Sequence, residues 1–137
     1  MENKIINSKD APAPIGPYSQ AVLAGNTLYV SGQIALHPET GELVQGSIEE
    51  ETHQVMRNMK AVLQEAGMPL SSVAKCTIFV KDMGNFGRIN EVYGSYFQNN
   101  PPARETVEVS RLPKDVNVEI SCIAVSSTRG VKLSGGL

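Results

Sequence analysis

The sequence predicts an α+β fold in which two helices cover one face of a mixed sheet, in the order ββαβαββ. Three observations support this prediction: two segments with helical spacing of apolar residues, five shorter β-prone runs, and turn-forming residues between them. The chain has 137 residues, 41% hydrophobic and 19% charged, which is typical of a globular domain. We therefore expect one domain over residues 1–126.

The first elements are predicted to be two short strands over residues 18–23 and 27–31. The Ala-Gly-Asn sequence at 24–26 separates them, and Gly and Asn tolerate the positive φ that a tight hairpin turn needs. Residues 10–17 contain three prolines, so they are expected to form an irregular lead-in. A long loop over residues 32–46 should follow the hairpin.

The clearest helix is predicted to begin at Ser47 and to end at Gly67. Ser47 and Glu50 fit a capping box, and Gly67 is a natural stop. Apolar and small residues recur at helical spacing on one side: Ile48, Thr52, Val55, Met59, Val62, Leu63 and Ala66. The three glutamates at 49–51 are expected to form a solvated first turn that the helix dipole favours.

The second half of the chain is predicted to hold a strand over 73–80, a helix over 86–97, and strands over 104–109 and 116–125. The helix carries its apolar residues on one side after an asparagine cap. The link at 110–115 is rich in turn formers, which favours an antiparallel pairing of the last two strands.

Two of these strands are apolar on both faces. In the last strand Val118, Ile120 and Cys122 share one face, while Ile123 and Val125 lie on the other. Two helices can cover only one face of such a sheet. The other face needs cover from another subunit, so we expect a closed homo-oligomer.

Charge and hydropathy narrow the possible partners and the location. The net charge of −2 and the pI near 5.7 give no bulk attraction to nucleic acid or to anionic membranes. The chain has no secretory signal and no apolar run long enough to span a membrane, so we expect a cytoplasmic protein. Residues 127–137 are small and polar, and we expect them to form a flexible C-terminal tail.

Most cofactor chemistry is also not indicated. His37 and His53 are isolated and lack the spacing of a metal site, and no glycine pattern matches a phosphate-binding loop. Cys76 and Cys122 lie in apolar runs and are interpreted as reduced packing residues, with a nucleophilic role as the minor alternative. We expect neither a metal nor another cofactor.

The end of the chain carries the strongest candidate chemistry. If the last two strands pair with Val107 on the core face, Arg104 and Thr106 share the other face with Glu119. Such a cation and carboxylate form either a structural ion pair or a site for a small anion, where Arg binds a carboxylate and Glu positions water or moves protons.

Several motifs of the chain resemble the Rid (reactive intermediate deaminase, YjgF-like) family. They are Ala-Pro-Ala-Pro-Ile-Gly-Pro-Tyr-Ser-Gln at 11–20, Ser-Gly-Gln-Ile at 31–34, Ile-Asn-Glu-Val-Tyr at 89–93, Pro-Ala-Arg at 102–104, and Val-Glu-Val-Ser-Arg-Leu-Pro-Lys-Asp-Val-Asn-Val-Glu-Ile at 107–120. The motifs follow the family's order and spacing over nearly the whole chain before the tail.

The resemblance implies a chorismate-mutase-like fold and a homotrimer whose sheets line an inner barrel, with sites between subunits. It also implies hydrolysis of 2-imino acids or their enamines, such as 2-iminopropanoate and 2-iminobutanoate, to 2-keto acids and ammonia. The partners would then be small 2-imino and 2-keto acids. No cofactor is needed, because a protonated imine is already electrophilic.

The resemblance also assigns roles to individual residues. Arg104 would bind the substrate carboxylate, Glu119 would hold the attacking water and transfer protons, and Tyr18 would close the site. The remaining substrate-binding residues would be Ser31, Gly32, Asn90 and Thr106.

One part of the sequence departs from the family pattern. After Pro-Ala-Arg many members continue Ser-Cys-Val, whereas this chain has Glu105-Thr106-Val107. Thr106 keeps a hydroxyl that can form hydrogen bonds. Glu105 adds a charge that would repel acidic imino acids unless its side chain points away.

Two other functions remain as alternatives. Rid-like proteins have been linked to non-catalytic regulation, in which the pocket captures a small ligand and acts on a transcription factor or an enzyme. Ribonuclease activity or inhibition of translation is attached to some relatives, but the acidic pI and the lack of an aromatic and basic stripe argue against it.

Overall fold

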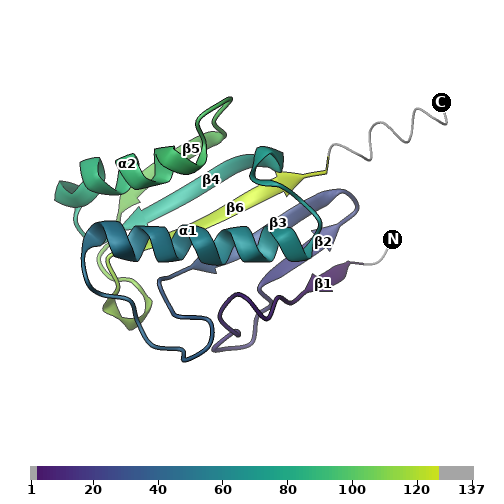
Figure 1. Ribbon diagram of the computed structural model, residues 1–137, viewed down its shortest axis with the longest axis horizontal. Helices are drawn as coiled ribbons and strands as arrows, with labels where there is room; N and C mark the ends of the chain where they lie inside the picture. The colour runs from purple at the N-terminus through teal and green to yellow at the C-terminus, as the bar shows by residue number, and fades with distance from the viewer. Residues whose placement is uncertain (1–2, 127–137) are drawn as a thin grey trace.

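A six-stranded mixed sheet with two helices on one face makes up the fold (Figure 1), in a computed structural model that describes residues 3–126. The sheet order is β1-β2-β3-β6-β4-β5. The elements are β1 Lys4–Ile6, β2 Ala21–Ala24, β3 Thr27–Gln33, α1 Ile48–Glu65, β4 Val73–Val80, α2 Phe86–Tyr96, β5 Ala103–Glu108 and β6 Val118–Val125, with short 3₁₀ turns η1 Leu70–Ser72, η2 Met83–Asn85 and η3 Pro113–Asp115. The predicted α+β class is confirmed, and β1 is a strand that the sequence did not predict.

Local sequence signals set the hairpin and the ends of the helices. Gly25 has a φ of 64° in the turn between β2 and β3, and Gly67 has a φ of 75° just after α1. Ser47 caps α1, because its side chain accepts a hydrogen bond from the Glu50 amide at 3.1 Å. These three predicted boundaries are confirmed.

The first turn of α1 differs from its prediction at one position. Glu51 is only 2% exposed, and its carboxylate accepts hydrogen bonds from the backbone and the side chain of Asn117. The expectation of three solvated glutamates is therefore wrong for Glu51. The glutamate pattern could not show this, because Asn117 lies 66 residues further along the chain.

The pairing of the last two strands is also different from the prediction. β5 pairs in parallel with β4, and β4 lies between β5 and β6 as the antiparallel neighbour of β6. The predicted antiparallel pair of the last two strands is therefore wrong. Its physical reason is composition: β4 and β6 are apolar enough for the buried centre of the sheet, whereas the polar β5 takes the edge.

The two faces of the sheet have different surroundings. On the helix face, buried residues such as Val30, Cys76 and Cys122 pack under α1 and α2 within the main core. The opposite face, which we call the open face, has no cover within the described residues, and its apolar Tyr29 and Val107 are 51% and 41% exposed. The prediction that another subunit covers this face remains a proposal.

Both cysteines are free and buried, and burial raises the pKa of each thiol. Neither helix in the described part of the chain combines the length and the apolar character that a membrane span requires. The tail expected over 127–137 lies outside the described residues.

Candidate functional site

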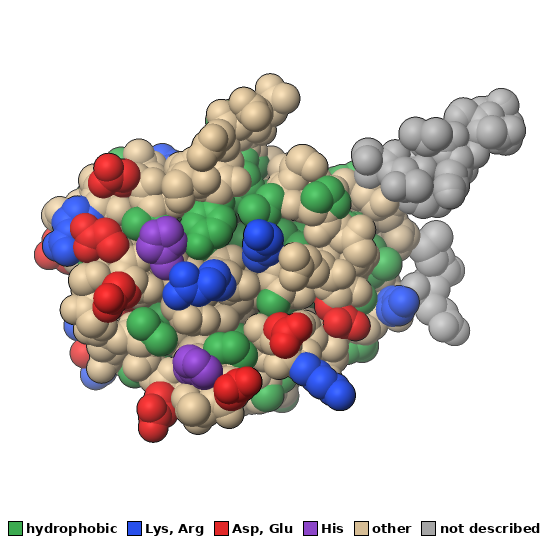
Figure 2. All heavy atoms as spheres, viewed as in Figure 1, with side chains coloured by type: hydrophobic (Ala, Val, Ile, Leu, Met, Phe, Trp, Pro, Cys, Tyr) green, Lys and Arg blue, Asp and Glu red, His purple; other side chains and the backbone are tan. Residues whose placement is uncertain are grey.

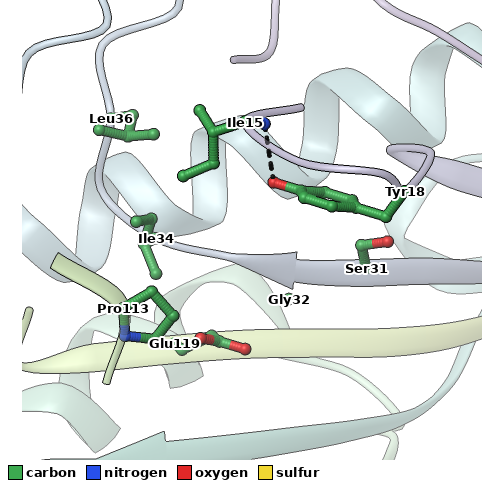
Figure 3. Close-up of a pocket in the computed structure, with 8 residues that line it drawn as sticks. All are labelled: Ile15, Tyr18, Ser31, Gly32, Ile34, Leu36, Pro113 and Glu119. Carbon is green, nitrogen blue, oxygen red and sulfur yellow. Dashed lines mark hydrogen bonds between the residues drawn. The ribbon is translucent and has the colours of Figure 1, made fainter. Parts of the chain in front are cut away.

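A cavity of about 470 Å³ opens beside the junction of β3 and β6 (Figure 3). Its walls come from the proline-rich lead-in, the end of β3 and the residues after it, η3, and the start of β6. The lining residues are Ile15, Tyr18, Ser31, Gly32, Ile34, Leu36, Pro113 and Glu119. Four of the predicted site residues, Tyr18, Ser31, Gly32 and Glu119, therefore meet in one cavity.

A β-bulge shapes the floor of this cavity. Val30 pairs with Cys122 and Gln33 with Ile120, so Ser31 and Gly32 together face a single residue of β6. A Cβ atom on Gly32 would lie 2.0 Å from Oε2 of Glu119. Only glycine lets the backbone of β3 come this close to the carboxylate.

A buried glutamine fixes the lead-in that carries Tyr18. The side-chain oxygen of Gln20 accepts from the Ser8 amide at 2.6 Å, and its Nε2 donates to the carbonyls of Ser8 and Pro12. The Tyr18 hydroxyl accepts a long hydrogen bond of 3.4 Å from the Ile15 amide, so the end of the ring points toward Ile15 on the same cavity wall (Figure 3). The sheet thus holds an otherwise irregular segment against the site.

Glu119 is the one charged side chain among the eight lining residues. It is half-buried, and this loss of hydration raises the pKa of its carboxyl above the ordinary value of 4.5. None of the salt bridges within residues 3–126 includes Glu119. A carboxylate without a cation, with a raised pKa and in a largely apolar cavity, is suited to accept and return protons.

Arg104 belongs to a second cluster at the edge of the sheet. Its Nη1 donates to Oδ1 of Asn90 at 2.6 Å, and its guanidinium lies 5.4 Å from the ring centre of Phe86 and 5.2 Å from that of Tyr93. Thr106, two residues along β5, has a buried hydroxyl with no hydrogen-bond partner among the described residues. Helix α2 therefore positions an exposed arginine on β5.

One chain places Arg104 and Glu119 on opposite faces of the sheet. Arg104 is in register with Cys76 on the helix face, whereas Glu119 is in register with Phe79 on the open face. The prediction that Arg104 and Thr106 share a face with Glu119 is therefore wrong. It assumed that β5 and β6 are neighbours, and the insertion of β4 between them removes that basis.

Comparison with known proteins identifies the family. The model of the endoribonuclease L-PSP family matches residues 8–126. A RutC family protein of Pyrococcus horikoshii is 54% identical over 121 residues, which is 88% of this chain and 96% of that protein. The 2-iminobutanoate/2-iminopropanoate deaminase of the rat is 47% identical over 122 residues, 89% of each chain. The crystal structure of the YjgF gene product of Escherichia coli superimposes with a TM-score of 0.85 at 43% identity, over 89% of this chain and 98% of that one.

The chain belongs to the Rid (YjgF-like) family. Its sheet and helices are consistent with the chorismate-mutase-like α+β fold that the resemblance implied.

Glu105, where this Rid chain departs from the common pattern, points away from Arg104. It lies on the open face, where its Oε2 accepts from the Thr77 hydroxyl at 2.7 Å and its Oε1 is 3.3 Å from Nζ of Lys75. The hydrogen bond from Thr77, and then Lys75, lower the pKa of this carboxyl. Glu105 is thus a partner of Lys75 and Thr77 and not a neighbour of the Arg104 cluster.

Sequence reasoning missed the apolar walls of this Rid cavity. Ile15, Ile34, Leu36 and Pro113 line it, although the first two and the last lie within the motifs that carry the resemblance. The signal available in the sequence was Ile15 in a proline-rich segment, because a large apolar residue between prolines has no core to enter. In the structure Ile15 is 58% exposed. An apolar side of the helix over 86–97 was predicted, but the contact of its Phe86 and Tyr93 rings with Arg104 was not.

No cluster of three or more His, Cys, Asp or Glu side chains suited to a metal ion occurs between residues 3 and 126.

Proposed function

We propose that this Rid protein hydrolyses reactive 2-imino acids and their enamine tautomers, such as 2-iminopropanoate and 2-iminobutanoate, to 2-keto acids and ammonia. The proposal rests on two side chains that are suited to this reaction. Glu119 is a half-buried carboxylate without a salt-bridge partner among the described residues, and Arg104 is an exposed guanidinium that α2 holds in place. The similarity to the rat protein named 2-iminobutanoate/2-iminopropanoate deaminase supports the same reaction.

Arg104 is the proposed binding group for the substrate carboxylate. One of its five N–H donors is engaged by Asn90, and the guanidinium carbon lies within cation–π distance of the Phe86 and Tyr93 rings. The remaining donors can form two parallel hydrogen bonds with a planar carboxylate. Thr106 lies on the same strand face, and its hydroxyl is buried without a hydrogen-bond partner among the described residues. Rotation of its side chain toward Arg104 would supply one further hydrogen bond to the substrate.

Glu119 is the proposed general base. It takes a proton from water as the water oxygen bonds to C2 of the protonated imine, and the C=N electron pair moves to nitrogen. Glu119 then returns that proton to the carbinolamine nitrogen, the C–N bond breaks and ammonia leaves. The hydroxyl loses its proton to the departing ammonia, which becomes ammonium, and the hydroxyl oxygen becomes the keto oxygen. The carbon changes no oxidation level, so these residues need to supply only orientation and proton transfer.

We further propose that two subunits complete each site, within a homotrimer. In one chain the two groups lie on opposite faces, so they can act on one substrate only if Arg104 of one subunit meets the Glu119 cavity of another. The apolar side chains on the open face support burial of that face between subunits. The sheets of such a trimer would line an inner barrel.

The decisive experiment is release of ammonia from imines generated by a dehydratase acting on serine or threonine. We expect acceleration by the parent protein, a loss of about 100-fold or more in Arg104→Ala, and strong impairment in Arg104→Lys, since a point charge cannot form two parallel hydrogen bonds. Lys60→Arg, a charge-conserving change at an exposed position of α1 away from both clusters, is the matched control and should match the parent.

Other results of this experiment would contradict the deaminase function or the role of Arg104. A folded parent that binds 2-keto acids but releases no ammonia would contradict the deaminase and favour a ligand-binding regulatory module. Parental rates in Arg104→Lys would exclude the paired hydrogen bonds. The endoribonuclease name belongs to the family model, and the lone carboxylate of this cavity would repel a nucleic-acid phosphate.

A further inference from the structure

One side of α1 carries three buried polar side chains, Glu51, Gln54 and Asn58, which we call the polar row. Their spacing of three and four residues places them on one side of the helix. Their exposed fractions are 2%, 8% and 1%. Burying polar groups costs free energy unless each one is hydrogen-bonded, so their partners indicate what the row does.

The first member of the polar row holds the start of β6. Oε2 of Glu51 accepts from the backbone amide of Asn117, and Oε1 accepts from its Nδ2, both at 2.8 Å. Asn117 immediately precedes β6, and Glu119 is its second residue. A charged acceptor with two hydrogen bonds therefore fixes the backbone two residues before the proposed general base.

The other members hold the opposite wall of the cavity. Nδ2 of Asn58 donates to the carbonyls of Ile34 at 3.2 Å and Leu36 at 2.9 Å. Its Oδ1 accepts from Nε2 of Gln54 at 2.8 Å, which fixes the orientation of the amide. Ile34 and Leu36 both line the cavity.

These partners share one property: they lie outside the regular strands. β3 ends at Gln33, before Ile34, and β6 begins after Asn117. Few backbone hydrogen bonds remain there: the Asn117 carbonyl accepts from the Lys81 amide at 3.0 Å, and the Ala35 carbonyl accepts from the Val44 amide at 2.8 Å. The side chains of α1 bind the Asn117 amide and the Ile34 and Leu36 carbonyls in addition. A small apolar cluster of Ile34, Leu36, Leu112 and Val116 packs between the two walls.

We propose that Glu51 and Asn58 are positioning residues that set the shape of the cavity, with Glu51 acting through Asn117 on the direction of Glu119. The expected effect on imine hydrolysis rests on the proposed function. The expected effect on the cavity depends only on the polar row and the two walls that it holds.

The test is Glu51→Gln, which keeps the shape of the side chain but replaces one acceptor oxygen with an NH₂ group that faces a donor of Asn117. We expect kcat for imine hydrolysis to fall about tenfold while the protein stays folded by circular dichroism. A second readout is independent of activity: in the ¹³C NMR titration of the Glu119 carboxyl, the raised pKa should move back toward its ordinary value, because a looser start of β6 admits water.

Two further variants separate positioning from general stability. Thr52→Val is the matched control, because Thr52 is fully buried next to Glu51 but its hydroxyl donates only to the Ile48 carbonyl of its own helix. It should change neither kcat nor the Glu119 titration. Glu51→Gln combined with Asn117→Asp should recover most of the lost activity, because the new amide can donate to the new carboxylate at unchanged net charge.

The possible outcomes are distinct. If Glu51→Gln, like Thr52→Val, changes neither kcat nor the Glu119 titration, the positioning role is wrong. If the parent protein hydrolyses no imine, the proposed function fails, yet the shift of the Glu119 titration still decides the inference. If the double variant is no better than Glu51→Gln, the effect does not pass through the contact with Asn117, which also overturns the proposal.

Discussion

At the scale of single residues, the protonation of Glu119 controls the proposed chemistry. Burial raises the pKa of this carboxyl above 4.5, and a general base acts only when deprotonated. Activity should therefore be complete well above that raised pKa and fall as the pH drops through it, at a higher pH than an ordinary glutamate would give. Initial rates over a pH series check this, and a rate that stays constant down to pH 4.5 would contradict the role.

Removing the charge at the same position gives a complementary prediction. Glu119→Gln keeps the shape of the side chain but cannot accept the proton of water, so kcat should fall by about 100-fold or more. The binding of a 2-keto acid, measured by calorimetry, should change much less, since Arg104 carries the carboxylate interaction. Equal losses in kcat and in affinity would indicate that Glu119 is a binding group instead.

Gly32 provides a test of how closely the backbone must approach Glu119. In Gly32→Ala the new Cβ would lie 2.0 Å from Oε2 of the glutamate, and the flexible end of that side chain would have to move away. We expect a loss of about tenfold or more in kcat/KM, with a change in Tm of only a few degrees because no backbone atom is displaced. An active Gly32→Ala protein would show that the observed position of the carboxylate is not required.

At the scale of secondary structure elements, two glycines should respond in opposite ways to the same substitution. Gly94 lies within α2, is exposed, and has open space where a Cβ would be, so Gly94→Ala should stabilise the protein by about 0.5–1 kcal/mol. Gly67 ends α1 with a φ of 75°, so Gly67→Ala should destabilise it by about 1 kcal/mol or more. Urea unfolding of both variants checks the signs, and stabilisation by Gly67→Ala would contradict the role of the positive φ.

The same scale shows what the sequence can predict. The hairpin at Gly25, the cap at Ser47 and the stop at Gly67 depend on residues within a few positions of each other, and all three are confirmed. The position of β5 depends on whether β4 or β6 is its neighbour, which is a competition between distant segments that periodicity does not report. The site residues were chosen from family motifs, but the face assigned to Arg104 rested on the assumption that β5 and β6 are neighbours. Because β4 lies between them, Arg104 and Glu119 are on opposite faces of the sheet.

Buried polar residues are also hard to predict from the sequence when their partners are distant along the chain. Glu51 and Asn58 look like surface residues in the sequence, because carboxylates and amides are mostly exposed. Their partners, Asn117, Ile34 and Leu36, are at least 22 residues away along the chain. Only the folded arrangement shows that α1 holds the cavity walls.

At the scale of the whole molecule, the separation of Arg104 and Glu119 by the sheet leads to a prediction about mixtures. Arg104→Ala and Glu119→Gln should each be nearly inactive alone. We assume that each site takes its arginine from one subunit and its glutamate from another. When equal amounts of the two variants are refolded together, one quarter of the sites should then combine an intact Arg104 with an intact Glu119. Each contributor has an even chance of being the suitable variant, so activity should recover to about one quarter of the parent value.

A matched mixture controls for nonspecific recovery. Glu119→Gln and Gly32→Ala both change the same cavity, so no arrangement of these two variants produces an intact site. Their mixture should be no more active than the average of the two components. Light scattering of the parent should give the mass of three chains, as the proposed trimer requires. The contrary result is no recovery in the Arg104→Ala and Glu119→Gln mixture although the subunits demonstrably exchange. Each site would then lie within one chain. Because Arg104 and Glu119 are on opposite faces of the sheet in one chain, this result would argue against their joint action.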